Sequence, residues 1–150
     1  MGVLKKILCF GDSNTWGYNP ANKCRFPKTI RWTGRLQTQL EPDYQIIEKG
    51  VNGRTTFHPD PLEPYPCGKV DLIPCLKSHS PIDIVVLLLG TNDLKSHINL
   101  TASEIAEGIL ALATMIQTSD YGVNNAAPNL LLLAPPPLGG LTELSERFEG

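Results

Sequence analysis

Three apolar segments of this chain each end in a polar turn that contains glycine. The segments cover residues 5–10, 44–49 and 82–89, and the turns after them are G-D-S at 11–13, V-N-G at 51–53 and G-T-N at 90–92. Open α/β sheets carry their ligands and their chemistry at such turns, because the carboxyl ends of parallel strands meet at one edge. The sequence therefore predicts a parallel sheet with a functional site at that edge.

The rest of the chain continues the alternation of strands and helices. A fourth apolar segment covers residues 129–134, and helices are expected at residues 31–40 and 71–79 and from a capping box at 101–104 to about residue 117. The aliphatic runs at 82–89 and 129–134 are typical of strands covered on both faces. We expect a single α/β domain over residues 1–150, with a doubly wound sheet whose last strand and helix are missing.

A sheet that lacks its last strand has an exposed apolar edge. Such an edge promotes association between copies, so a homo-oligomer or poor solubility is expected. A formal charge of −2 and a pI near 5.9 give no electrostatic reason to expect nucleic acid or an anionic membrane as partner.

The four cysteines have no C-x-x-C spacing. They are therefore expected to be reduced thiols rather than metal ligands, and we expect no metal and no cofactor. No apolar stretch reaches 18 residues and no signal peptide is recognisable, so the chain is predicted to be cytoplasmic without a membrane span.

Ser13 is the first candidate for chemistry, because it follows Gly11 directly beyond a predicted strand. Backbone amides beyond such a turn can stabilise an oxyanion, and a serine there can act as a nucleophile. It can also be an ordinary helix N-cap. A third interpretation makes Asp12 a phosphatase-type nucleophile, but this chemistry requires a second carboxylate where Asn14 stands. No phosphate-binding glycine loop is present.

Considered together with Ser13, Gly53 and Asn92 indicate a function. Their amides, with the backbone amide of Ser13, would supply three donors to the negative oxygen of an acyl-transfer transition state. Taken singly, Gly53 is explained by a tight turn and Asn92 by a helix cap.

Four further residues of these turns are candidates. Asp12 is expected to support Ser13, and substrate contacts are predicted for Trp16, Arg54 and Thr55.

These three turns resemble the first three motif blocks of the GDSL, or SGNH, hydrolases. The matching residues are G-D-S at 11–13, N-G-R-T-T at 52–56 and G-T-N-D at 90–93, and residues 30–34 and 134–138 resemble the arylesterase and acetyl-esterase branch. The resemblance implies a flavodoxin-like three-layer α/β/α sandwich and hydrolysis of small acyl esters through an acyl-serine. It also implies that Ser13 is the nucleophile and that Gly53 and Asn92 complete the oxyanion hole.

The sequence departs from this family in one respect. The family takes its catalytic acid and base from an Asp-x-x-His motif near the C-terminus, and no such motif occurs here. The histidines present are His58, His79 and His97, all upstream of that place. At the end of the predicted helix 71–79, His79 is expected to be solvated or to cap a helix carbonyl. The leading hypothesis is an SGNH esterase cut short before this motif. The loop 57–67, which includes Tyr65, is expected to wall its acyl pocket. The alternatives are a non-catalytic binding module and an acyltransferase that uses the same serine.

Overall fold

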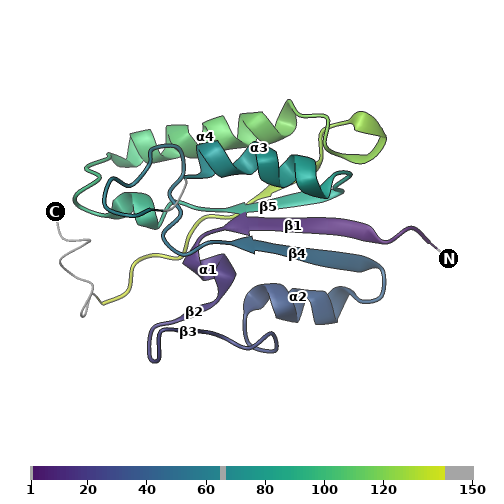
Figure 1. Cartoon of the computed structure of the whole chain (residues 1–150), viewed down its shortest axis with the longest axis horizontal. Helices are drawn as coiled ribbons and strands as arrows, with labels where there is room; N and C mark the ends of the chain where they lie inside the picture. Colours follow the sequence, from purple (N-terminus) through teal and green to yellow (C-terminus); the bar gives the residue numbers. More distant parts are fainter. Residues whose placement is uncertain (1, 65–66, 141–150) are drawn as a thin grey trace.

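The computed structural model describes residues 2–64 and 67–140 and contains a four-stranded parallel sheet in the order β4-β1-β5-β6. The strands are β1 (Lys5–Gly11), β4 (Tyr44–Gly50), β5 (Ile84–Leu88) and β6 (Asn129–Leu132), and their carboxyl ends lie on the same side of the molecule (Figure 1). All four strands were predicted. β5 is shorter than the predicted 82–89, because Ile82 pairs only with Gly122 in an isolated bridge.

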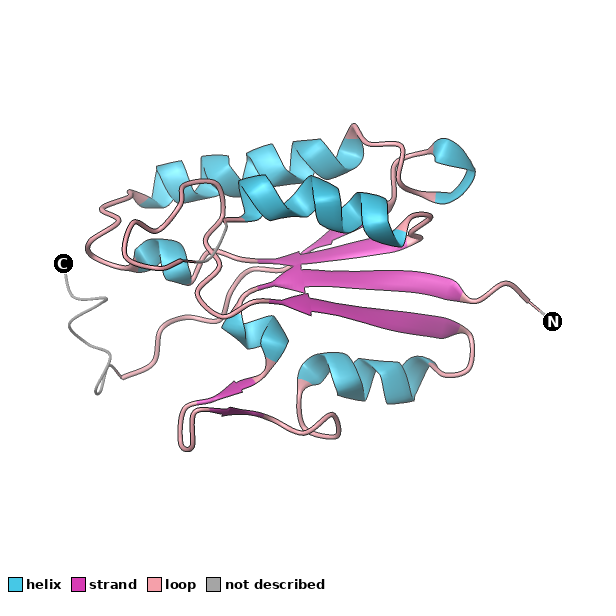
Figure 2. Ribbon diagram, in the orientation of Figure 1, coloured by secondary structure: helices cyan, strands magenta, loops and turns pink. Residues whose placement is uncertain are grey.

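Helices cover both faces of the sheet, as expected for the predicted α/β sandwich (Figure 2). One face carries α2 (Trp32–Leu40), and the other carries α3 (Gly68–His79) and α4 (Ala102–Gln117). The capping box at the start of α4 is present, with Thr101 and Glu104 exchanging hydrogen bonds. The short elements α1 (Ser13–Trp16), β2 (Tyr18–Asn19), β3 (Cys24–Arg25), η1 (Asn92–Leu94) and η2 (Val123–Asn125) escaped prediction, because a periodic pattern needs more residues.

The core consists of two apolar layers, one on each side of the sheet. Leu8 and Phe10 of β1 point toward α3 and α4, while Ile7 and Cys9 point toward α2, in the alternation that a strand imposes. Fully buried leucines and isoleucines of this kind each contribute about 1.5–3 kcal/mol to folding. All four cysteines are free thiols.

The edge strand β6 is more exposed than its sequence suggests. Its aliphatic run predicted cover on both faces, and this is correct for β5 but wrong for β6, where Leu131 is 51% and Leu132 is 49% exposed. The cause is position: β6 is the edge strand, Leu131 lies on the sheet face where α2 packs against β4 and β1, and Leu132 lines an apolar groove beside α4. An apolar sheet edge was expected, and it is present.

Among the described helices, none combines the length and the apolar character needed to cross a membrane.

Candidate active site

Ser13 lies at the first position of α1, immediately beyond β1. Asp12 forms the N-cap of α1, since its Oδ1 accepts a hydrogen bond from the Asn14 amide at 2.9 Å. The interpretation of Ser13 as the N-cap is therefore wrong. The Ser13 side chain is partly exposed and makes no hydrogen bond to another described residue. Its hydroxyl is thus left available for chemistry.

Gly11 makes this close turn sterically accessible. A Cβ at Gly11 would lie 2.1 Å from Thr15 Oγ1 and 2.7 Å from the carbonyl oxygen of Leu88. Neither distance is tolerable, so any other residue would push α1 away from the end of β5. The glycine therefore fixes where Ser13 stands relative to the neighbouring strand.

Gly53 occupies a tight turn after β4. The Arg54 amide donates to the carbonyl of Val51 at 3.2 Å, and Gly53 has a φ of +80°, the value at the third position of a type II turn. Side chains rarely adopt this backbone conformation, so glycine is favoured here. The turn explanation of Gly53 is correct, and it is compatible with the predicted role of the Gly53 amide as an oxyanion donor.

Asn92 begins η1 and is only 7% exposed. Its Nδ2 donates to the carbonyl oxygen of Arg54 at 3.1 Å, while Thr91 occupies the N-cap position. The interpretation of Asn92 as a helix cap is therefore wrong. A side-chain amide carries two hydrogens, and the bond to Arg54 uses one of them. The second hydrogen can be offered to a ligand.

Hydrogen bonds join the three turns in pairs. Val51 N donates to Gly11 O at 3.1 Å, which ties the second turn to the first. Asn14 Nδ2 donates to Thr91 Oγ1 at 3.3 Å, which ties the first to the third, and the Asn92 bond ties the third to the second. We call the residues 11–14, 51–54 and 90–93 the Ser13 edge. The structure thus brings Ser13, Gly53 and Asn92 to one side of the sheet.

The buried carboxylate of Asp93 links the third turn of this edge to the segment that follows the second turn. Asp93 is fully buried and accepts hydrogen bonds from the amide of Thr56 at 3.0 Å and from its hydroxyl at 2.6 Å. Burial raises the pKa of Asp93, and burial with a smaller contribution from Asp93 raises the pKa of Asp12 to about 6. Sequence reasoning missed the link between Thr56 and Asp93, because these residues lie 37 positions apart.

The three predicted substrate-binding residues differ in accessibility. Trp16 is partly exposed and packs against the guanidinium of Arg25, 5.3 Å from the ring centroid. Arg54 and Thr55 are 4% and 2% exposed, and the Thr55 hydroxyl donates to the carbonyl of His58 at 2.6 Å. The structure therefore leaves Trp16 accessible to a ligand, whereas it gives Arg54 and Thr55 contacts inside the protein in place of the predicted substrate contacts.

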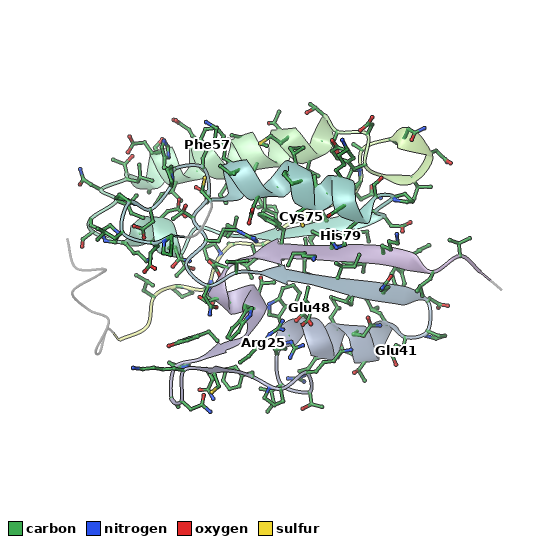
Figure 3. The ribbon with its side chains drawn as sticks, viewed as in Figure 1. Arg25, Glu41, Glu48, Phe57, Cys75 and His79 are labelled. Atoms are coloured by element: carbon green, nitrogen blue, oxygen red, sulfur yellow. The ribbon has the colours of Figure 1, made fainter. Side chains whose placement is uncertain are left out.

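The three histidines occupy different surroundings. His79 lies at the end of α3, where its Nδ1 is 2.8 Å from the carbonyl oxygen of Cys75 (Figure 3), so the expected carbonyl-capping role is present. This helix end is remote from the Ser13 edge, because His79 O contacts Lys6 at the start of β1. His58 is exposed and follows the Thr55-Thr56 segment.

His97 belongs to an ionic cluster beside η1 in which Asp60 and Lys95 are buried. Its Nε2 lies 2.7 Å from Asp60 Oδ1, and the Lys95 ammonium lies 2.9 Å from Asp60 Oδ2. Burial alone would disfavour the Asp60 carboxylate, but hydrogen bonds from the Leu62 amide, Lys95 and His97 lower its pKa to about 2. The cluster joins the loop after Phe57 to the loop after Asn92. Tyr65, predicted to wall an acyl pocket in this loop, lies outside the described residues.

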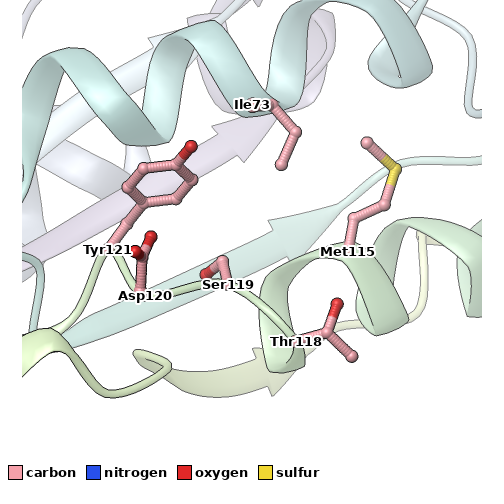
Figure 4. Close-up of a pocket in the computed structure, with 6 residues that line it drawn as sticks. All are labelled: Ile73, Met115, Thr118, Ser119, Asp120 and Tyr121. Atoms are coloured by element: carbon pink, nitrogen blue, oxygen red, sulfur yellow. The ribbon is translucent and has the colours of Figure 1, made fainter.

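Two hollows differ in character and position. An apolar groove of about 550 Å³ runs from Gly90 along α4 to β6, and its lining includes Leu94, Ile105 and Leu132. A second hollow of about 450 Å³ lies beside the end of α4, between Ile73 and Tyr121 (Figure 4). In the described part of the chain, no three His, Cys, Asp or Glu side chains are grouped so that they could hold a metal ion.

Residues 9–149 match the GDSL-like Lipase/Acylhydrolase family. The chain belongs to this family. No curated protein sequence matches it. The predicted family resemblance and the predicted α/β sandwich are thus both confirmed.

Solved structures of esterases resemble this GDSL-family chain closely. The inhibitor-bound aryl esterase of M. smegmatis is 42% identical with a TM-score of 0.91, over 97% of this chain and 71% of that one. Est24, a carbohydrate acetylesterase from Sinorhizobium meliloti, is 40% identical with a TM-score of 0.92, over 97% and 72%. AlinE4, an SGNH-hydrolase family esterase, is 26% identical with a TM-score of 0.65, over 91% and 63%. Family membership and these esterase structures support a carboxylic ester hydrolase.

Proposed function

We propose that the Ser13 edge is the nucleophile and oxyanion site of an esterase that cleaves small acyl esters. The observation that carries the proposal is the pairwise bonding of the three turns, which leaves the Ser13 hydroxyl and one Asn92 amide hydrogen unused. Similarity to an aryl esterase and to a carbohydrate acetylesterase supports acetyl and aryl esters as the substrate class.

In the first step, Ser13 Oγ attacks the ester carbonyl carbon and loses its proton to a base. The carbonyl electron pair moves to oxygen, which accepts hydrogen bonds from the amides of Ser13 and Gly53 and from Asn92 Nδ2. Collapse of this intermediate breaks the bond to the alcohol, which leaves with a proton. Water then attacks the acyl-serine, releases the carboxylic acid and returns the proton to Ser13. An alcohol in place of water would give acyl transfer with the same residues.

The base that accepts the Ser13 proton has two candidates within the chain. An Asp-x-x-His motif does not occur between Met1 and Gly150. His58 follows the second turn of the Ser13 edge and His97 follows the third, and they are the candidates within the chain. A serine hydroxyl without a base is a weak nucleophile at neutral pH, and loss of one triad member lowers the rate by roughly four to six decades.

The test is hydrolysis of p-nitrophenyl acetate by the wild-type chain and by the Ser13→Ala variant. We expect p-nitrophenolate release that depends on Ser13, with one acetyl group found on the peptide that contains it. His58→Ala and His97→Ala then identify a base within the chain. Equal release by wild type and Ser13→Ala would favour the alternative in which this chain binds an acyl ligand without cleaving it.

A further inference from the structure

The side chain of Arg54 connects two of the three turns from inside the protein. Its Nη1 donates to the carbonyl oxygen of Gly11 at 3.0 Å and to that of Lys49 at 2.7 Å. Its Nη2 pairs with Asp71 Oδ2 of α3 at 2.6 Å. Gly11 immediately precedes the Asp12-Ser13 turn and Lys49 immediately precedes Gly50, so one planar group holds the ends of β1 and β4 together.

The chemistry of arginine explains this choice of residue. A guanidinium presents several donors in a fixed plane, whereas a lysine ammonium is a point charge that cannot hold three acceptors in this arrangement. The guanidinium carbon of Arg54 also lies 4.1 Å from the ring centroid of Phe10, in cation–π distance. Its side chain is only 5% exposed, which rules out a role as a surface charge.

The backbone of the same residue reaches the third turn. The Arg54 amide closes the turn that carries Gly53, and the Arg54 carbonyl accepts the hydrogen bond from Asn92 Nδ2 at 3.1 Å. A shift of Arg54 would therefore move the Gly53 amide and release the Asn92 amide at the same time. Each of the three donors of the proposed oxyanion hole is attached to a segment that Arg54 contacts.

We propose that Arg54 is the positioning residue of the oxyanion hole and sets the relative placement of the Ser13, Gly53 and Asn92 donors. This inference rests on the proposed function, since it requires that these donors receive an oxyanion. It assigns to Arg54 a role through other residues, without contact to substrate.

Binding of phenylboronic acid tests the inference without requiring a catalytic base. Ser13 Oγ forms a bond to boron, the serine proton is released to solvent, and the resulting tetrahedral boronate imitates the oxyanion at equilibrium. The affinity is measured by ¹¹B NMR titration of the full chain, below the melting temperature of each variant. The variants are Arg54→Lys and Arg54→Met, with Asp71→Asn as the matched control that removes the ion pair and leaves the bonds to Gly11 and Lys49.

We expect Arg54→Lys and Arg54→Met to bind the boronate at least about tenfold more weakly than wild type, since misplaced donors stabilise an oxyanion poorly. Asp71→Asn should stay within about twofold of wild type, even though its melting temperature falls. Unchanged affinity in folded Arg54→Lys, or an equal loss in Asp71→Asn, would overturn the inference. Failure of the proposed function looks different, because wild type would then form no tetrahedral adduct that Ser13→Ala abolishes.

If Arg54→Met does not fold, Arg54→Lys decides alone, because it retains the charge and most of the stem. The side-chain amide signals of Asn92 give a second measurement. We expect them to shift in Arg54→Lys and to stay in place in Asp71→Asn. Unshifted Asn92 signals in Arg54→Lys would contradict the positioning role.

Discussion

The Ser13 edge and the β6 edge of the same sheet differ in how they are stabilised and covered. At the Ser13 edge, three turns are joined in pairs by hydrogen bonds and supported by the buried side chains of Arg54 and Asp93. At the β6 edge, Leu131 and Leu132 are about half exposed beside an open apolar groove. The hydrogen bonds that join and support the Ser13 edge are made among residues 11–93, before β6 begins.

The largest effect is expected for a substitution at the Ser13 edge, on the rate of ester cleavage. Asn92→Ala removes one proposed oxyanion donor, and loss of such a donor lowers the rate of acyl transfer by about 100-fold or more. The measurement is the initial rate of Ser13-dependent p-nitrophenyl acetate cleavage. A matched control is Asn99→Ala, since Asn99 lies outside the three turns. An Asn92→Ala rate within twofold of wild type, with the fold retained, would remove Asn92 from the oxyanion hole.

A stability effect is expected on the side of the sheet that carries α2. There, Glu48 of β4 binds Arg31 and Thr33 and lies near Arg25 (Figure 3). The hydrogen bond from Arg31, against the opposing effect of burial, lowers the pKa of Glu48 from 4.5 to about 2. The carboxylate therefore stabilises the fold fully above pH 4.5, and this stability is lost as the pH falls toward 2.

Replacement of Glu48 by glutamine should cost on the order of 2 kcal/mol at pH 7 and much less near pH 2. Urea unfolding at the two pH values measures this difference. The boronate affinity of Ser13 should not change in the folded variant. An equal cost at both pH values would show that the charge of Glu48 does not stabilise the fold.

A smaller effect is expected at the β6 edge. Leu131→Lys places a charge on the uncovered face of the edge strand, where charged side chains oppose pairing between copies. We expect self-association to weaken by about tenfold, with esterase activity unchanged. Light scattering over a concentration series measures the association. A wild-type chain that remains monomeric at every concentration would contradict the expectation that this edge promotes association.

An effect of opposite sign to that of Glu48 concerns the pH dependence of stability at Asp12. Burial raises the pKa of Asp12 to about 6 from its usual 3.8, so charging it costs the folded state free energy as the pH rises from about 4 to 6. Asp12→Asn keeps an acceptor for the Asn14 amide and removes this charge. The free energy of unfolding should therefore vary less over this range in Asp12→Asn than in wild type. Identical pH profiles would contradict it.

The sequence predicted the strands and the turns of the Ser13 edge because both are local features. An aliphatic run and the glycine after it lie within ten residues of each other, and parallel strands place such turns at the same edge. The roles of Arg54 and of the Asp60–Lys95–His97 cluster could not be predicted, since their partners lie up to 43 positions away. The predicted cover on both faces of β6 was wrong for another reason: an aliphatic run does not specify which elements will cover it.

The central claim is that the amides of Ser13 and Gly53 and the Asn92 side chain receive one oxyanion. A crystal structure of the chain with phenylboronic acid bound tests it most directly. The account predicts a tetrahedral boron on Ser13 Oγ with one boronate oxygen about 2.7–3.1 Å from all three donors. A boronate oxygen that points to solvent, or a boron attached to a different residue, would contradict it.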